Sequence, residues 1–251
     1  MNVDAYLQRI GYTGSRTPGA GTLASLHEAH LRRVPFENLD IHRGVEIVLE
    51  AGWLFDKIVT RRRGGFCYEL NGLLALLLEA LGFSVQRLSA RVIDDAGGVG
   101  PEFDHLALMV ELEERWLADV GFGDSFLRPL RLDERGEQVD PAGVFRLASQ
   151  AERWWLESRD ADGTWRESYR FTMLPRTIEE FAPMCRWQQT SPDSHFTKKT
   201  VCTLPTPTGR VTLSGNRLIT TERNRRDEAE LADEAQIQSA LQRLFGIDVR
   251  P

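Results

Sequence analysis

Cys67 is the residue whose sequence context most clearly points to chemistry. It lies in RRRGGFCYELNGLLALLLEALG, residues 61–82, after Gly64 and Gly65 and at the start of an apolar stretch that predicts a buried helix over 67–81. A helix N-terminus has unpaired N–H groups and a partial positive charge, which favour a thiolate and hence a nucleophile. The Cys67 amide would then stabilise an oxyanion, and the glycines would let backbone approach the group under attack. A small buried cysteine beside a tight turn fits these residues equally well.

A nucleophilic cysteine needs a base, and the chain has five histidines. They are His27, His30, His42, His105 and His195. We expect the first two on the surface of an amphipathic helix and the third in a loop, whereas the last, in SPDSHF, is a second candidate. His105 begins HLALMVEL and shares one strand face with Ala107 and Met109. The small Ala107 leaves room for the ring to point into a cleft, although an ordinary histidine at a strand edge is the alternative.

Asp119 supplies the third group. In RWLADVGFGD it is surrounded by apolar residues, where an unpaired carboxylate would be costly to bury. The loop at 112–114 lacks residues suited to a two-residue turn, and a three-residue loop would pair Glu111 with Arg115. Asp119 would then share a face with His105, one diagonal step away at roughly 7–8 Å between backbones. In this cysteine–histidine–aspartate site, the thiolate attacks, the histidine moves the proton and the aspartate holds the imidazole tautomer.

The elements around these residues follow from the hydrophobic periodicity. Residues 2–34 and 51–65 have helical spacing, as does the stretch that begins at Cys67. After Gly82 the period changes to two, with short strands within 83–93, 104–112, 115–122, 144–149, 153–160 and 164–173. Residues 177–190 return to helix, 197–222 form hairpin strands, and 228–246 form a closing amphipathic helix. The order is a helical bundle, then antiparallel β structure, then a small α/β segment.

Composition excludes several classes of protein. The net charge of −6 over 251 residues gives no overall attraction to nucleic acid. No apolar run approaches the roughly 20 residues that span a bilayer, and the N-terminus lacks a signal-peptide pattern, so we expect no membrane partner. Three widely separated cysteines argue against a disulfide framework and for the reducing cytoplasm. Cysteines and histidines show no metal-ligand spacing, and we predict no metal.

Five separated segments also resemble one family. RRGGFCYELNGL, DHLALMV and LADVGFGD are similar to the signature segments of the arylamine N-acetyltransferases, and VPFENL and PRTIEEFAPM…QQTSPDSHFTKKTVC resemble two more in the same order. The resemblance covers most of residues 5–225 and implies Cys67, His105 and Asp119 as catalytic residues. It implies a cytoplasmic enzyme of xenobiotic metabolism. Acetyl-coenzyme A would be the donor, and an arylamine, an arylhydrazine or a similar small molecule the acceptor.

The same resemblance implies an α+β fold in three parts around a cysteine-protease- or transglutaminase-like core. They are a helical bundle over 1–83 that carries the nucleophile, an antiparallel β-barrel-like domain over 84–185 that carries the histidine and aspartate, and an α/β lid over 186–251. The closing helix resembles the family least.

Other site residues are assigned as follows. Phe36 and Phe122 flank the motif segments and would form an aromatic slot for a flat amine, with core packing as the alternative. Gly98 and Ser194 are the candidates for coenzyme contacts, although Asp193 and His195 stand where the family has small hydroxyl residues.

We expect Glu37 and Arg63 to form an ion pair that braces the loop before Cys67. Cys185 and Cys202 are expected to pack in the core, because neither follows a glycine-rich helix start.

Two kinds of function use such a site. The first is a ping-pong N-acetyltransferase, in which the cysteine takes acetyl from the coenzyme and a neutral aromatic amine attacks the acetyl-cysteine. The alternative is an amide synthase, or a transglutaminase-like acyltransferase or hydrolase, that handles a larger acyl group or a protein amide. A peptide substrate would need an open cleft.

Overall fold

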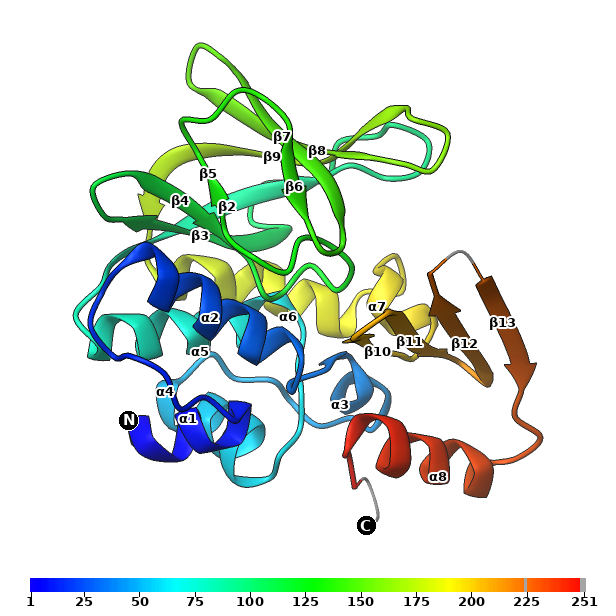
Figure 1. Cartoon of the computed structure of the whole chain (residues 1–251). Helices are drawn as coiled ribbons and strands as arrows, with labels where there is room; N and C mark the ends of the chain where they lie inside the picture. The colour runs from blue at the N-terminus through cyan, green and yellow to red at the C-terminus, as the bar shows by residue number, and fades with distance from the viewer. Residues whose placement is uncertain (224, 249–251) are drawn as a thin grey trace.

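A strongly curved antiparallel sheet lies above a group of helices, and a smaller sheet lies beside them (Figure 1). The structure is a computed structural model that describes residues 1–223 and 225–248. The helical elements before residue 83 are α1 (Val3–Ile10), α2 (Ala20–Leu31), α3 (Leu39–His42), α4 (Ala51–Phe55), the π-helix η1 (Asp56–Thr60) and α5 (Cys67–Ala80). Those after it are the 3-10 helix η2 (Ile178–Phe181), α6 (Ala182–Thr190), α7 (His195–Lys198) and α8 (Glu234–Phe245).

Helix α5 is the central helix of the molecule. It begins at Cys67, as the sequence predicts, and most of its residues are buried, so little of its surface faces water. Complete burial stabilises the fold by about 1.5–3 kcal/mol for each leucine. Helices α1, α2 and α4 pack around it, and none of the described helices is long and apolar enough to cross a membrane.

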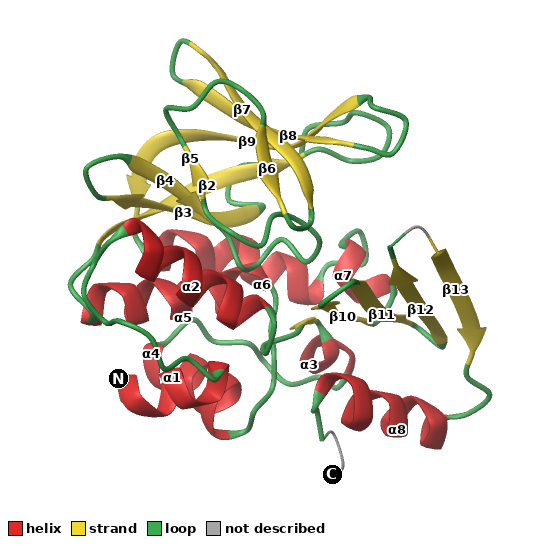
Figure 2. Cartoon of the chain, in the orientation of Figure 1, coloured by secondary structure: helices red, strands yellow, loops and turns green. Residues whose placement is uncertain are grey.

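The large sheet has eight strands in the order β5-β4-β3-β2-β9-β8-β7-β6 (Figure 2). In chain order these are β2 (Ser84–Val92), β3 (His105–Glu111), β4 (Arg115–Ala118), β5 (Leu130–Arg131), β6 (Gln138–Asp140), β7 (Gly143–Gln150), β8 (Arg153–Arg159) and β9 (Trp165–Arg176). Each predicted strand has a counterpart, although the one predicted over 115–122 ends at Ala118, so Asp119 directly follows β4. The sequence did not predict β5 and β6, which are two and three residues long and carry no alternating pattern of their own.

The register of the β3–β4 hairpin is the one that the loop argument predicts. Glu111 pairs with Arg115 and Leu108 with Ala118, across a loop of residues 112–114. Alternate residues of β3 face different cores: Leu106 and Leu108 pack on the helices, and Ala107 and Met109 face the inside of the curved sheet. His105 therefore begins β3 on the inner face.

Side chains join the two edge strands of the large sheet. The Gln138 amide of β6 donates to the Arg131 carbonyl of β5 at 3.0 Å, and its Oε1 accepts from the Arg131 N–H at 2.8 Å. Asp140 accepts from the backbone N–H groups of Leu127 and Arg128, each at 2.9 Å. These contacts link β6 to β5 and to the loop before β5, so the sheet curves into the expected barrel-like form.

The smaller sheet has the order β1-β10-β11-β12-β13. Its strands are β1 (Phe36–Glu37), β10 (Val201–Thr206), β11 (Gly209–Ser214), β12 (Arg217–Glu222) and β13 (Arg225–Glu230). The closing helix predicted over 228–246 is wrong at its start, because residues 225–230 form β13 and α8 begins at Glu234. Strand β13 is exposed along its length, so no alternation marks it.

The expected α+β fold class is confirmed, with a helical bundle, a barrel-like sheet and an α/β segment. The division at residues 83 and 185 stays a prediction. Two contacts cross the predicted boundaries: β1, in the first part, pairs with β10, and Cys185 packs in the cluster formed by the helices.

Candidate active site

Cys67 is the first residue of α5 and is only 3% exposed. Because it begins the helix, its backbone N–H has no intrahelical acceptor. Burial raises the pKa of the Cys67 thiol well above its usual range, and a backbone hydrogen bond from Leu106 only partly offsets this. The expectation that the helix start alone favours the thiolate therefore needs correction. A neighbouring base must take the proton.

The glycines before Cys67 allow close packing within the protein itself. A Cβ atom at Gly64 would collide with the Pro35 carbonyl, and the Glu37 N–H donates to the Gly65 carbonyl at 2.9 Å. Gly64 therefore lets the loop pack against Pro35, and Gly65 lets it pack against Glu69, whose carboxylate would lie 2.6 Å from a Cβ atom there. The expected approach of this backbone to the group that the sulfur attacks stays a prediction.

The loop before Cys67 is held by a buried ionic cluster formed by Glu37, Asp40, Lys57, Arg63 and Glu69. Arg63 donates to Glu37 at 2.8 Å and contacts Asp40 at 3.0 Å, which confirms the predicted Arg63–Glu37 pair. Lys57 contacts Glu69 at 2.8 Å and Asp40 at 2.9 Å. Glu69 also accepts from the Phe66 N–H at 3.1 Å, one residue before the cysteine.

His105 and Asp119 form a direct hydrogen bond. Nε2 of His105 lies 2.7 Å from Oδ2 of Asp119, and both residues are buried. The prediction that the two side chains meet is thereby confirmed. Because an ionised carboxylate only accepts, Nε2 carries the proton and Nδ1 is left as the acceptor of the ring. Among the described residues, Nδ1 has no hydrogen-bond partner.

Asp119 is the most fully bonded side chain of the site. Its Oδ1 accepts from Asn71 Nδ2 at 2.8 Å and from the Gly121 N–H at 2.9 Å. A Cβ atom at Gly121 would lie 2.6 Å from the Cys67 Cα, so only glycine lets this loop approach the cysteine so closely. Burial alone would raise the pKa of Asp119, but the electrostatic attraction and hydrogen bond of His105, with the bonds from Asn71 and Gly121, hold it below its usual range.

Cys67 and His105 line one cavity of about 190 Å³, together with Phe36 and Phe122. The structure thus brings the two predicted substrate-slot residues to the cysteine. The Phe122 ring lies edge-on to the His105 ring, with centroids 5.3 Å apart. The sequence missed Phe196, whose ring lies 6.1 Å from that of Phe36.

Polar residues line the other side of this cavity. Asp104, Gln188 and His195 are among them, and Gln188 donates to Asp104 at 2.7 Å. His195 was a candidate base in the sequence, and it lies in the cavity without a bond to Asp119. Asp104 directly precedes the predicted base, but a carboxylate before a histidine gives no pattern by which sequence reasoning could find it.

Gly98 and Ser194, the predicted coenzyme contacts, do not line this cavity. The Gly98 N–H donates to Asp94 at 2.7 Å within an exposed turn. The Ser194 hydroxyl is buried, donates to Gln188 at 2.6 Å and accepts from the Phe196 N–H at 3.1 Å. Both coenzyme assignments stay predictions.

The expected surface position of His27 and His30 is wrong, because both side chains are completely buried. The residues of α2 at helical spacing with Leu23 include both histidines, so the periodicity itself could have placed them on the inner face. His30 bonds the Tyr6 hydroxyl at 2.8 Å. His42 is exposed and is the last residue of α3 rather than a loop residue.

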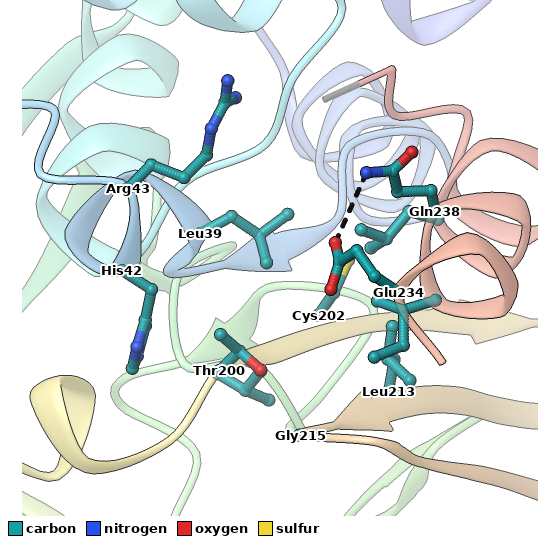
Figure 3. Close-up of a pocket in the computed structure, with 12 residues that line it drawn as sticks. Leu39, His42, Arg43, Thr200, Cys202, Leu213, Gly215, Glu234 and Gln238 are labelled. Carbon is teal, nitrogen blue, oxygen red and sulfur yellow. Dashed lines mark hydrogen bonds between the residues drawn. The ribbon is translucent and has the colours of Figure 1, made fainter. Parts of the chain in front are cut away.

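A second cavity, of about 480 Å³, lies between α3, β10, β11 and α8 (Figure 3). Cys202 and Leu213 line it, as do Glu234 and Gln238, and Glu234 accepts a hydrogen bond from Gln238 at 3.4 Å. It contains neither the histidine nor the aspartate of the predicted site. Within residues 1–223 and 225–248, no group of three or more histidine, cysteine or carboxylate side chains is arranged to hold a metal ion.

Comparison with known proteins identifies relatives along the whole chain. A family model described as N-acetyltransferase matches residues 20–251. Arylamine N-acetyltransferase 1 of Homo sapiens is 35% identical over 276 residues, which cover 100% of this chain and 95% of the relative. The arylamine N-acetyltransferase of Mycolicibacterium smegmatis is 37% identical over 256 residues, which cover 99% of this chain and 93% of the relative.

Solved structures match the fold over nearly the whole chain. The arylamine N-acetyltransferase of M. tuberculosis superposes with a TM-score of 0.93 at 34% identity, covering 99% of this chain and 94% of the other. The Mycobacterium marinum arylamine N-acetyltransferase in complex with CoA superposes with a TM-score of 0.92 at 32% identity, covering 99% and 93%.

Proposed function

Because this chain belongs to the arylamine N-acetyltransferase family, we propose that it moves acetyl from acetyl-coenzyme A to an aromatic amine or hydrazine through an acetyl-cysteine on Cys67. One observation carries the proposal. Cys67 and His105 line the same small cavity, and Asp119 bonds the far side of the His105 ring at 2.7 Å. The three side chains therefore have the order that histidine-assisted thiol chemistry needs.

The first half-reaction loads the enzyme. His105 Nδ1 takes the thiol proton of Cys67 as the sulfur attacks the thioester carbonyl. The Cys67 N–H at the start of α5 faces no helical acceptor and is available to the developing oxyanion. The carbon–sulfur bond to the coenzyme then breaks, and the coenzyme leaves as a thiol with the proton from His105. The Asp119 carboxylate balances the imidazolium while it exists.

The second half-reaction unloads the enzyme. An aromatic amine is neutral at pH 7, so its nitrogen attacks the acetyl-cysteine without prior loss of a proton. His105 takes the proton released from the nitrogen, and as the carbon–sulfur bond breaks it passes that proton to the leaving sulfur, which restores the Cys67 thiol. The rings of Phe36 and Phe122 beside the sulfur would hold the flat acceptor.

The size of the cavity supports a small acyl group and a small acceptor. At about 190 Å³ it is below the roughly 300–1,000 Å³ of sites for drug-sized ligands. A peptide amide or a long acyl chain would need more open space beside the sulfur. The proposed setting is the cytoplasm, since the three cysteines are free thiols. Gly98 and Ser194 remain the proposed coenzyme contacts.

The acetyl-enzyme is the species to measure. Incubation with acetyl-coenzyme A in the absence of amine is expected to add one acetyl group, located at Cys67 by peptide mapping. Iodoacetamide should block this acetylation, and an added aromatic amine should discharge it. Cys185 and Cys202 are buried away from the histidine–aspartate pair and serve as internal controls. Acetylation at either of them, or full turnover by C67A, would contradict the proposal.

A further inference from the structure

His27 bonds the backbone of Asp119, whereas His105 bonds its carboxylate. His27 lies on α2, is completely buried, and its ring stacks on Phe126 with centroids 5.6 Å apart. The Asp119 N–H donates to His27 Nε2 at 2.9 Å, and His27 Nδ1 lies 2.8 Å from the Leu127 carbonyl oxygen.

These two contacts fix the tautomer of His27. A backbone N–H can only donate, so Nε2 must be an unprotonated acceptor. A carbonyl can only accept, so Nδ1 must carry the proton. The two bonds can form together only when the His27 ring is neutral. Burial favours the neutral ring, because it lowers the pKa of His27. The charged groups that act on the ring are Asp119 and Asp140, which are too weak to reverse this effect.

The two bonds join both ends of one loop to α2. Residues 119–127 leave β4, pass Gly121 and Phe122 at the cavity, and reach Leu127. The Leu127 N–H donates to Asp140, and the Leu127 carbonyl accepts from His27. The Asp119 side chain is fixed by His105, Asn71 and Gly121, but the Asp119 N–H has His27 as its acceptor. A buried N–H without an acceptor costs about 1–3 kcal/mol, so loss of His27 Nε2 would favour a shift of the residue.

We infer that His27 is a positioning residue, which holds the Asp119 backbone so that its carboxylate meets His105 at hydrogen-bond distance. The inference rests on the proposed function, because it assigns His27 a role in the reaction of Cys67, His105 and Asp119. It requires that the bond at Nε2, and not the burial of the ring alone, determines the rate of the chemical step.

Two amide substitutions distinguish the hydrogen bond at Nε2 of His27 from the one at Nδ1. In H27Q the terminal amide reaches the place of Nε2 and its oxygen can accept from the Asp119 N–H. In H27N the shorter amide occupies the place of Nδ1, and its NH2 can donate to the Leu127 carbonyl while the Asp119 N–H is left without an acceptor. We expect H27Q to keep kcat within about threefold of the wild type and H27N to lose on the order of 10- to 100-fold, with KM for the amine little changed. H30Q and H30N, at a buried histidine of the same helix that bonds Tyr6, are the matched controls.

A second readout does not depend on turnover. The rate of iodoacetamide alkylation of Cys67 is measured against pH for each variant, with urea unfolding to give the folded fraction. We expect the midpoint of this profile to shift in H27N and to stay unchanged in H27Q, H30Q and H30N. Wild-type kcat and profile in H27N would overturn the inference. So would equal kcat per folded molecule in H27Q and H27N. If H27N does not fold, the test rests on kcat of folded H27Q. A large loss of kcat in H27Q would overturn the inference, because this variant keeps an acceptor for the Asp119 N–H.

The wild-type and H105N proteins separate this result from failure of the proposed function. If Cys67 alkylation in the wild type does not depend on His105, the proposed mechanism is wrong whatever the His27 variants do. If it does depend on His105 and H27N changes nothing, only the His27 inference fails.

Discussion

At the scale of single residues, Asp119 takes part in four hydrogen bonds that bear on the chemistry. Its carboxylate accepts from His105, Asn71 and Gly121, and its own N–H donates to His27. Every donor aimed at the carboxylate favours its charged form, which is why its pKa stays below the usual range despite complete burial. A fixed negative charge at this point keeps the proton on Nε2 of His105, and Nδ1 is the nitrogen left to accept the thiol proton.

Substitution of Asp119 by asparagine tests this charge. We expect D119N to fold and to lose on the order of 10³-fold or more in kcat, because the amide favours the wrong imidazole tautomer and cannot balance an imidazolium. Steady-state kinetics with acetyl-coenzyme A and an aromatic amine give the rate, and circular dichroism gives the folded content. N71D, which puts a second carboxylate beside Asp119, should also reduce the rate. Near wild-type kcat in well-folded D119N would remove Asp119 from the mechanism.

The Cys67 thiol gives a second prediction at this scale. Since burial raises its pKa, the thiol keeps its proton at neutral pH unless His105 accepts it. In H105N, alkylation of Cys67 by iodoacetamide at pH 7 should fall by about tenfold or more and recover as the pH rises. Mass spectrometry of the labelled peptide measures the rate. An alkylation rate at pH 7 equal to that of the wild type would mean that another group takes the proton.

At the scale of elements, the sequence predicts what local chemistry determines. The β3–β4 register follows from the loop at residues 112–114, whose glutamates do not suit a two-residue turn, and this register alone puts His105 and Asp119 on one face. The start of α5 follows from the switch from glycines to leucines. Strands β5 and β6 could not be predicted, because they are two and three residues long and are joined by the Gln138 side chain, which leaves no hydrophobic period. Strand β13 is exposed along its length, so it has no hydrophobic period either.

Some candidate site residues can be predicted from local sequence, whereas others depend on tertiary packing. The three proposed catalytic residues are marked by local context, whereas Lys57 and Glu69 are brought together only by the packing of η1 on α5. His27 is polar, but its spacing with Leu23 places it on the inner face of α2, where the side chain is buried. For this residue, position along the helix indicates burial better than residue type does.

Asp140 gives a prediction about the edge of the barrel. Its carboxylate accepts from the N–H groups of Leu127, Arg128 and Ala142. D140A leaves these donors without a partner at a largely buried site, and we expect it to lower the free energy of unfolding by about 2–3 kcal/mol. E137A removes a more exposed carboxylate nearby, whose ion pair with Arg159 should contribute less than about 1 kcal/mol. Urea unfolding of both variants measures the difference, and equal losses would show that Asp140 does not close the barrel.

At the scale of the whole molecule, the buried ionic cluster joins four helices or strands and one loop. Glu37 and Asp40 come from β1 and α3, Lys57 and Arg63 from η1 and the loop after it, and Glu69 from α5. Three carboxylates face two cations, so the cluster has one negative charge too many if all are ionised. Binding one proton balances the charges. Burial and the nearby Glu37 charge raise the pKa of Glu69 to about 7, although Lys57 acts in the opposite direction, so we expect Glu69 to take this proton.

The raised pKa of Glu69 gives stability a pH dependence with a defined sign. Between the ordinary value of 4.5 and about 7, the folded protein binds this proton and the unfolded chain does not. The contribution of Glu69 is therefore fully present below pH 4.5 and is lost as pH rises through about 7. E69Q carries a permanently neutral amide, so its unfolding free energy should lack this loss. We expect the difference between E69Q and the wild type to shift by about 1–3 kcal/mol in favour of E69Q between pH 5 and pH 8.

Urea unfolding of wild type and E69Q at intervals across this pH range measures the difference. Asp119 does not obscure it, because its pKa is lowered and its contribution is lost only as the pH falls through acid values. E79Q removes an exposed carboxylate from the same helix and is the matched control. A difference between E69Q and wild type that is constant from pH 5 to pH 8 would mean that Glu69 is ionised throughout. The excess negative charge would then be carried by the cluster itself, within a few residues of Cys67.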